Sequence, residues 1–405
     1  MRTLAHVCLL VASFAGMVTP ASAQVAVPTC AINAGVPPTV RAEGLSEHAG
    51  DIVLTCVGTP AAPVTGNLQV FFNTNLTSRL TASATSEALL LLGTVYDPNS
   101  PPPPNLEPQP GNQIAGVNLF QGTVSGPNSL TFSNITVLPA AQASVGRVLR
   151  LTNLRLDASA LGGTPAQHLA LVTFSNPSSL ALVNPQQTVA YNGPELTFSA
   201  AGSGQCPAAT GTLTFTEAFS SQFKVRGAGT SVPGFIVNDE SMFVPDPTIA
   251  IVGLADTGTQ LSATFTGLPA GAQISVPATA TNGSLVLTAV SPAGGGSVQA
   301  ANGTATVVYE VTATSYLASE SVSIPFSATG VAGTLVVEGR FAPISAVAAA
   351  SDTAPIPRFA DRGIRATIPV AACATSPAPA MGGYGLALLA LLLVLFAAAR
   401  FRAAR

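Results

Sequence analysis

Apolar residues alternate with polar ones along much of this 405-residue chain, and helical spacing is nearly absent. In most of these stretches one face is apolar and the other carries mainly Ser, Thr, Asn, Arg or Glu. This alternation is typical of a half-buried antiparallel strand, so we predict an all-β fold. The clearest apolar series are Leu68, Val70, Phe72; Leu130, Phe132; Leu149, Leu151; Leu261, Ala263, Phe265; Val307, Tyr309, Val311; Val322, Ile324, Phe326; and Leu335, Val337, Phe341.

Turn signals separate these stretches. Asn-Gly pairs begin at positions 282 and 302, and Pro-Ala-Gly triplets begin at 269 and 292. Short strands with such turns indicate antiparallel β-sandwiches. We predict a β-sandwich domain over 24–200 and a second β-rich region over 201–344, which contains an immunoglobulin-like sandwich at 245–344. An Ala- and Pro-rich spacer is expected over 345–380, and helix is expected mainly at the two ends of the chain.

Residues 1–23 have the pattern of a secretory signal peptide. The basic residue Arg2 precedes an apolar stretch over 7–18, and Ala-Ser-Ala at 21–23 forms an A-x-A cleavage site. The apolar stretch is too short to be a stable membrane span. We therefore predict that the chain is exported and that cleavage follows Ala23.

The other end of the chain, 381–405, is predicted to be a transmembrane helix. An uncharged run of about 19 residues, Met381–Ala399, is followed by Arg400, Arg402 and Arg405. A helix of this length, at about 1.5 Å per residue, approaches the roughly 30 Å hydrocarbon core, and the arginines favour the cytoplasmic side. A buried C-terminal helix is the alternative, but the run is apolar all round and ends in a basic cluster.

Gly382 and Gly383, the apolar run and the Arg-rich end resemble the tripartite C-terminal sorting signals of bacterial surface proteins, the Gly-Gly and PEP-type CTERM tails. The resemblance implies that a membrane protease or transpeptidase recognises the short motif and releases or re-anchors the body. Pro377 and Pro379 stand nearby but form no Pro-Glu-Pro triplet. The partners expected at this end are therefore the membrane and a sorting protease.

A proline-rich stretch over 97–112 interrupts the first domain. Its seven prolines deny the backbone hydrogen-bond donors and favour polyproline II, so we expect an exposed loop or stalk in place of a strand. A proline-rich ligand for a partner protein is the alternative interpretation.

Charge is scarce, because charged residues make up 8% of the chain against about 25% in typical proteins. Arg2 and the three arginines of the tail lie outside the predicted mature body. That body keeps 11 basic residues against all 18 acidic ones, a net charge of about −7. We expect no basic face that could neutralise phosphates, so nucleic acid is an improbable partner. A surface of Ser, Thr, Asn and Gly fits an extracellular β protein, and a GC-rich genome is an equally good explanation of the composition.

The mature chain contains four cysteines, Cys30, Cys56, Cys206 and Cys373. An exported chain meets an oxidising compartment, where four cysteines allow three pairings. Pairing Cys30 with Cys56 is the parsimonious choice, since closing that loop of roughly 27 residues contributes about 3 to 4 kcal/mol. Cys206 and Cys373 would then join the start and the end of the second half.

Three acidic pairs are candidates for general acid and base chemistry: Asp239 with Glu240, Glu43 with Glu47, and Asp352 with Asp361. None lies in a recognisable glycosidase pattern, and solvated loop charges explain them more simply. Calcium needs several oxygen ligands in a compact loop, and Asp239, Glu240 and Asp246 lack that spacing.

The remaining candidates are the two histidines of the mature chain, a glycine triplet and the aromatic residues. We predict that His48 lies in a surface loop and that His168 lies in a strand. The triplet Gly294–Gly296 is followed by Ser-Val without Lys, so it indicates a turn and not a phosphate loop. Trp is absent and Tyr occurs five times, which disfavours a carbohydrate module of the stacking kind. We predict no catalytic, metal or cofactor site.

Four segments of the body resemble a group of secreted, uncharacterised β-rich proteins from environmental bacteria. They are PPTVRAEGLSEHAGDIVLTC (Pro37–Cys56), FFNTNLTSRL (Phe71–Leu80), FTEAFSSQFKVR (Phe215–Arg226) and IPRFAD (Ile356–Asp361). The resemblance touches both halves of the chain but implies no particular activity.

Together these features predict a non-enzymatic cell-surface or envelope protein with a structural or adhesive role. One alternative is a surface module that binds a polysaccharide or an extracellular protein. A second is a hydrolase that uses Asp239 and Glu240. The predicted location is exported, at the envelope or extracellular surface, with membrane anchoring that is at least transient.

Overall fold

The computed structural model describes residues 27–58, 63–94, 115–116, 118–137, 147–230, 237–245, 252–373, 388 and 390–396. Strands account for the regular structure of this part of the chain except for a helix at 388 and 390–396. The all-β prediction is therefore confirmed. The predicted signal peptide 1–23, the proline-rich stretch 97–112 and the residues Gly382, Gly383, Arg400, Arg402 and Arg405 lie outside the described residues.

The first unit is a single sheet of 12 strands in the order β13-β1-β4-β10-β7-β8-β9-β5-β12-β14-β2, with β6 beside β7. Neighbouring strands are antiparallel except for β1 with β13 and β14 with β2. β1 also lies against β14, so the sheet curls until its two ends approach each other. The strands are β1 (Thr29–Ala34), β2 (Thr39–Val40), β4 (Ile52–Val57), β5 (Val64–Phe72), β6 (Leu80–Ala82), β7 (Thr85–Thr94), β8 (Leu119–Gly126), β9 (Ser129–Val137), β10 (Arg147–Thr152), β12 (Gln167–Phe174), β13 (Ala181–Val183) and β14 (Gln186–Asn192).

The alternating residues of these strands form the core of the first unit. Leu68, Val70 and Phe72 of β5 point inward and are buried together with Leu130 and Phe132 of β9, as predicted. The prediction of a two-sheet sandwich differs from the structure here, because one curled sheet encloses the core.

The second unit is a sandwich of two six-stranded sheets, ordered β21-β18-β23-β16-β15-β26 and β19-β20-β22-β17-β24-β25. Their inward faces share one core, in which the rings of Phe265 and Phe326 meet edge to face with centroids 5.0 Å apart. The strands are β15 (Thr197–Gln205), β16 (Ala208–Thr216), β17 (Gln260–Thr266), β18 (Gln273–Val276), β19 (Thr279–Asn282), β20 (Leu285–Ser291), β21 (Gly296–Gln299), β22 (Thr304–Ala313), β23 (Ser321–Thr329), β24 (Leu335–Ala342), β25 (Ile364–Ile368) and β26 (Val370–Ala371).

The second unit extends beyond the predicted sandwich at both ends. β15 and β16 belong to it, although they precede residue 245, and β25 and β26 lie within the predicted spacer 345–380. Over 345–373 the chain therefore packs onto the body and does not act as a spacer. β25 pairs with the edge of β24, where Leu335–Gly339 supplies the backbone partners.

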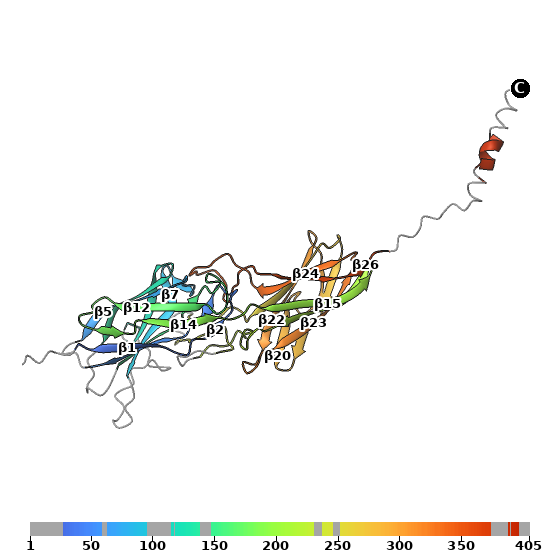
Figure 1. Cartoon of the computed structure of the whole chain (residues 1–405). Coiled ribbons are helices and arrows are strands. Elements are labelled where there is room, and N and C mark those ends of the chain that lie inside the picture. Colours follow the sequence, from blue (N-terminus) through green and yellow to red (C-terminus); the bar gives the residue numbers. More distant parts are fainter. Residues whose placement is uncertain are drawn as a thin grey trace, which may run out of the picture.

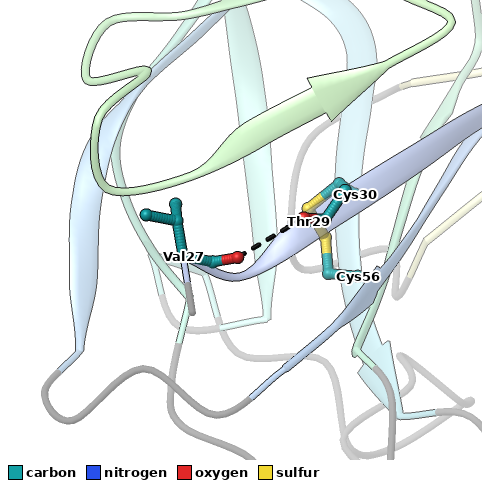
Figure 2. The surroundings of a disulfide bond; sticks show 4 residues. All are labelled: Val27, Thr29, Cys30 and Cys56. Carbon is teal, nitrogen blue, oxygen red and sulfur yellow. Dashed lines mark hydrogen bonds between the residues drawn. A yellow bond between two sulfur atoms is a disulfide. The ribbon is translucent and has the colours of Figure 1, made fainter. Parts of the chain in front are cut away.

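Two disulfides fix the ends of the folded body. Cys30 and Cys56 stand opposite each other on the neighbouring strands β1 and β4 and are bonded (Figure 2). Cys206 in the β15–β16 turn is bonded to Cys373, which follows β26. The favoured pairing, Cys30 with Cys56 and Cys206 with Cys373, is confirmed.

The two units lie end to end, with β1 and β12 on one side of the molecule and β20 and β24 on the other (Figure 1). The region between them, called the junction below, is built from connecting segments at 39–50, 74–79, 153–158, 217–227, 237–245, 252–259 and 343–362. Its regular pairing is a two-stranded sheet of β3 (Glu47–His48) and β11 (Arg155–Leu156).

Candidate functional site at the junction

Arg41 lies at the centre of the junction and joins carboxylates from two distant parts of the chain. Its side chain is buried, and Nε donates to Glu47 Oε1 at 2.7 Å. Nη1 donates to Glu240 Oε1 at 2.7 Å and to Thr259 Oγ1 at 2.8 Å, and Nη2 donates to Glu240 Oε2 at 3.1 Å. The guanidinium is also 4.7 Å from the ring centroid of Phe359, close enough for a cation–π interaction.

Local backbone pairing places Glu240 against this guanidinium. The segment at 238–240 runs beside Val225, with Glu240 N donating to Val225 O at 2.8 Å and Val225 N donating to Asn238 O at 2.9 Å. Thr259 is held by the residue before Val225, because the Thr259 N–H donates to Lys224 O. Three segments of the second half thus converge on one residue of the first.

A second buried ion pair, Arg155 with Glu87, lies beside the first. Arg155 Nε donates to Glu87 Oε1 at 3.0 Å, and both side chains are fully buried. Arg155 Nη2 donates to the backbone oxygen of Glu240 at 2.8 Å, while Glu87 Oε2 accepts from Gly253 N at 3.1 Å. Each pair therefore makes contacts across the boundary between the two units.

His48 and Lys224 complete what we call the junction cluster, with Arg41, Glu47, Glu87, Arg155 and Glu240. His48 Nε2 lies 2.8 Å from Glu240 O, so this nitrogen donates its proton to the carbonyl. Burial, with Arg155 and Lys224 nearby, lowers the pKa of His48 well below 6.5, and the imidazole is neutral. Lys224 Nζ lies 3.9 Å from Glu47 Oε2.

The charges of the cluster adjust one another's protonation. Burial alone would raise the pKa of Glu240, but Arg41 and Lys224 lower it below its ordinary value. Burial would lower the pKa of Arg41, but Glu240 and Glu47 raise it above its ordinary value. Burial lowers the pKa of Lys224, with Arg41 acting in the same direction and Glu47 against it. Arg41 and Glu240 therefore stay ionised, and the pair is held by charge as well as by hydrogen bonds.

The return segment, defined as residues 343–362, crosses from the second unit back onto the first. Arg358 is buried and donates to the carbonyl oxygens of Val347 (2.9 Å), Ala349 (2.9 Å), Pro355 (3.2 Å) and Thr77 (3.2 Å). Phe359 stacks on Phe341 with ring centroids 4.8 Å apart. This segment closes the junction over Arg41.

The structure corrects the prediction of solvated loop charges for the pair Glu43 and Glu47, for Glu240 and for His48. Glu43, Glu47, Glu240 and His48 are all buried. Glu43 Oε1 accepts the N–H of Leu196 at 2.7 Å, and burial raises the pKa of Glu43. The reason is that these residues lie between two packed units, where a charge is tolerated only with partners.

The other sequence candidates are less central. Asp352 and Asp361 are exposed, and Asp361 pairs with Arg340. His168 lies in β12, as predicted, and its Nε2 is 2.7 Å from Asn192 Oδ1. Asp246 lies outside the described residues. Among the residues that the structure describes, no group of three or more His, Cys, Asp or Glu could hold a metal ion.

The four segments that the sequence analysis singles out, Pro37–Cys56, Phe71–Leu80, Phe215–Arg226 and Ile356–Asp361, meet at the junction. Pro37–Cys56 contributes Arg41, Glu47 and His48, and Phe215–Arg226 contributes Lys224. Phe71–Leu80 supplies Thr77, the partner of Arg358, and Ile356–Asp361 supplies Arg358 itself. Arg155 and Glu87 lie outside these segments.

An open cleft of about 610 Å³, called the junction cleft below, lies between residues of the two halves of the chain. It is lined by residues 35–39, Asp51, Val53 and Arg150 of the first unit and by residues 219–221 and Val237 of the second half. Asp51 Oδ2 and Arg150 Nη1 lie 3.5 Å apart in its wall. Unlike the cluster, this cleft presents polar side chains to solvent.

Comparisons with known proteins give little guidance. No protein-family model matches the chain, and no curated protein matches it either. Among solved structures, the collagen adhesin from S. aureus aligns at 10% identity and TM-score 0.19, over 84% of this chain and 91% of that chain. The C-terminal domain of the Streptococcus agalactiae AgI/II polypeptide BspA aligns at 9% identity and TM-score 0.28, over 84% and 99%. Red sea bream transglutaminase aligns at 10% identity and TM-score 0.20, over 86% and 32%. TM-scores this low do not establish a common fold.

Proposed function

We propose that this chain is a non-enzymatic protein of the cell surface or envelope with a structural or adhesive role. The observation that carries the proposal is the buried junction cluster. Its ionisable side chains, which could in principle act in catalysis, are withdrawn from solvent and bonded to one another. Their arrangement instead joins two β units end to end into one body (Figure 1).

Two further features support a place outside the cytoplasm. The two disulfides suit an oxidising compartment, and the first 23 residues have the pattern of a secretory signal. A body that is poor in charge and fixed by disulfides at both ends is suited to display at a surface.

Anchoring by the C-terminal tail is part of the same proposal. The tail resembles Gly-Gly and PEP-type CTERM sorting signals, which implies insertion in the membrane and processing by a sorting protease. Within the described part of the chain, no helix reaches the length and apolarity needed to cross a bilayer. Intact mass spectrometry of the mature protein tests this step, because the mass reports both cleavage sites.

The role itself is tested in the organism that makes the protein. A deletion strain is compared with the wild type and with a complemented strain for surface attachment and for envelope integrity. We expect the deletion to impair at least one of the two and complementation to restore it. Unchanged attachment together with an unchanged envelope would show that the proposed role is wrong.

A surface module that captures a polysaccharide or an extracellular protein is the second candidate. The junction cleft favours it, because an open pocket with an acidic and a basic side chain is suited to bind a ligand. The hydrolase alternative is weakened, since Glu240 is buried and bonded to Arg41. A broad substrate screen of wild type and Asp239→Asn tests that alternative, and we expect no turnover by either.

A further inference from the structure

The junction cleft has the dimensions and the openness of a ligand site. Its volume of about 610 Å³ falls within the range of about 300 to 1,000 Å³ that is usual for small-molecule pockets. Both halves of the chain contribute to its walls, so its shape depends on the way the junction cluster joins them. The cleft is therefore formed where the two halves of the folded chain meet.

Its polar wall carries one acceptor and one donor side by side. Arg150 lies on the outer face of β10 and stands opposite Val53 of β4. Asp51 comes two residues before Val53 in the chain. The Arg150 side chain is 34% exposed and that of Asp51, which also lines the cleft, is 10% exposed. A carboxylate accepts hydrogen bonds only, and a guanidinium donates only.

The remaining lining combines apolar side chains with hydroxyl groups. Val36 is 88% exposed and Val237 36% exposed, and Pro37 and Pro38 lie beside them. The Phe219 ring packs closely on Gly193, where an added Cβ would lie 2.5 Å from the ring. Ser220 and Ser221 add side-chain hydroxyl groups to the same wall.

We propose that the junction cleft binds a neutral carbohydrate through its hydroxyl groups, with a neighbouring pair on Asp51 and Arg150. Apolar C–H groups of the sugar lie against Phe219, a single contact and not the Trp or Tyr stacking platform that the composition disfavours. A hydroxyl group both donates and accepts, so a vicinal pair satisfies the acceptor and the donor together. An anionic group would meet the Asp51 carboxylate, and a cationic group would meet the Arg150 guanidinium, so either is disfavoured. This inference deepens the adhesive form of the proposed function and rests on it.

The test uses the mature full-length protein on an array of neutral oligosaccharides built of glucose, mannose, galactose and N-acetylglucosamine. Sialylated and sulfated oligosaccharides on the same array are the charged comparison. We expect binding to neutral members. The strongest binder is then titrated by calorimetry against wild type, Arg150→Gln and Phe219→Leu.

Arg150→Gln loses a hydrogen bond from a charged group, and Phe219→Leu loses an apolar contact. Each variant is therefore expected to weaken binding by about tenfold or more. Arg365→Gln is the matched control, since Arg365 is 77% exposed on β25, and its binding should equal that of the wild type. Thermal melts confirm that all variants fold. Binding only to charged oligosaccharides, no binding at all, or equal binding by Arg150→Gln would overturn the proposal.

A cell assay separates this inference from the proposed function. If deletion impairs attachment but cells that carry Arg150→Gln attach like the wild type, the cleft proposal is wrong and the surface role stands. If deletion changes neither attachment nor the envelope, the surface role is wrong, and the array alone decides whether the cleft binds carbohydrate.

Discussion

Arg41 shows how a single side chain can determine the geometry of a junction. Moving a guanidinium and two carboxylates out of water costs several kcal/mol per ion, and this cost is offset only when the hydrogen bonds are complete. Arg41 bonds Glu47, Glu240 and Thr259 and covers the face of Phe359. Such a pair adds little net stability over an apolar core, but breaking it is costly.

Replacing Arg41 with Met is expected to destabilise the protein strongly. Met fills similar space, but Glu47 and Glu240 are left as buried carboxylates without their principal partner. We expect the free energy of unfolding to fall by about 3 to 5 kcal/mol, measured by urea denaturation of the oxidised protein.

The control for this change is Arg365→Met. Arg365 pairs with Glu338 at 2.9 Å but is largely exposed, and such surface pairs contribute about 0 to 1 kcal/mol. An Arg41→Met protein no less stable than Arg365→Met would contradict our account of the junction.

His48 is expected to make stability fall in mild acid. Its folded pKa lies well below 6.5, so the unfolded chain takes up a proton as the pH falls through about 6.5 while the folded protein does not. The free energy of unfolding therefore decreases below that pH. Gln at this position can still donate to Glu240 O without titrating. Between about pH 7.5 and pH 5, the free energy of unfolding of His48→Gln should therefore fall by about 1 to 2 kcal/mol less than that of the wild type.

Other groups with shifted pKa values, among them His168 and Glu217, are common to both proteins. Burial lowers the pKa of His168, so His168, like His48, lowers the stability of the protein as the pH falls. Burial raises the pKa of Glu217 to about 7, so Glu217 lowers stability as the pH rises from about 4.5 through 7. Urea denaturation of wild type and His48→Gln at several pH values isolates His48, and parallel stability profiles would refute its assigned role.

At the scale of elements, the strands of the second unit show why the alternation of apolar and polar residues predicts which side chains are buried. β17 is paired on both sides, with β22 and with β24, so every second side chain must enter the core. Phe265 points inward, and its neighbour Thr264 points outward to Thr306 of β22, with the two hydroxyl oxygens 3.0 Å apart.

Adjacent substitutions on β17 should therefore have unequal effects. Phe265→Ala removes a fully buried ring that packs on Phe326, and we expect a loss of about 3 to 5 kcal/mol. Thr264→Val keeps the β-branched shape and loses one surface hydrogen bond, so its cost should stay below about 1 kcal/mol. Urea denaturation of both variants measures the difference, and similar losses would mean that β17 is not oriented as described.

At the scale of the whole molecule, the junction makes two β units interdependent. Domains joined by a small contact usually unfold separately. Here three buried charges of the first unit have partners in the second half. Arg41 pairs with the Glu240 carboxylate, Arg155 donates to the Glu240 backbone oxygen, and Glu87 accepts from Gly253 N. Separating the units would leave these groups without partners.

We therefore expect the wild-type protein to unfold in a single calorimetric transition. The double variant Arg41→Met with Glu240→Gln removes the central ion pair and should broaden the transition or split it in two, because the units then unfold with less mutual dependence. Differential scanning calorimetry makes the comparison, with Arg365→Met as the control that keeps one transition. Two transitions in the wild type would contradict the coupling.

The strands and the disulfides could be predicted from the sequence, because the signals are local. A spacing of two is imposed by the pleat of a strand, so Leu68, Val70 and Phe72 identify β5 without any knowledge of its neighbours. Cys30 and Cys56 are close in the chain, and the pairing of the other two cysteines follows by exclusion. Over 345–373, the high content of Ala and Pro concealed β25. In this strand the small residue Ala366 stands between Ile364 and Ile368, which weakens the alternation of apolar and polar side chains.

The junction was decided by tertiary structure alone. Glu47 and Glu240 are far apart in the chain, and nothing in either segment states that one guanidinium joins them. Sequence reasoning assigns isolated charges to solvent because most charged residues are exposed, and this default failed at Glu47, His48 and Glu240. A buried charge is tolerated only when distant partners complete its hydrogen bonds, and the packing of the two units brings those partners together.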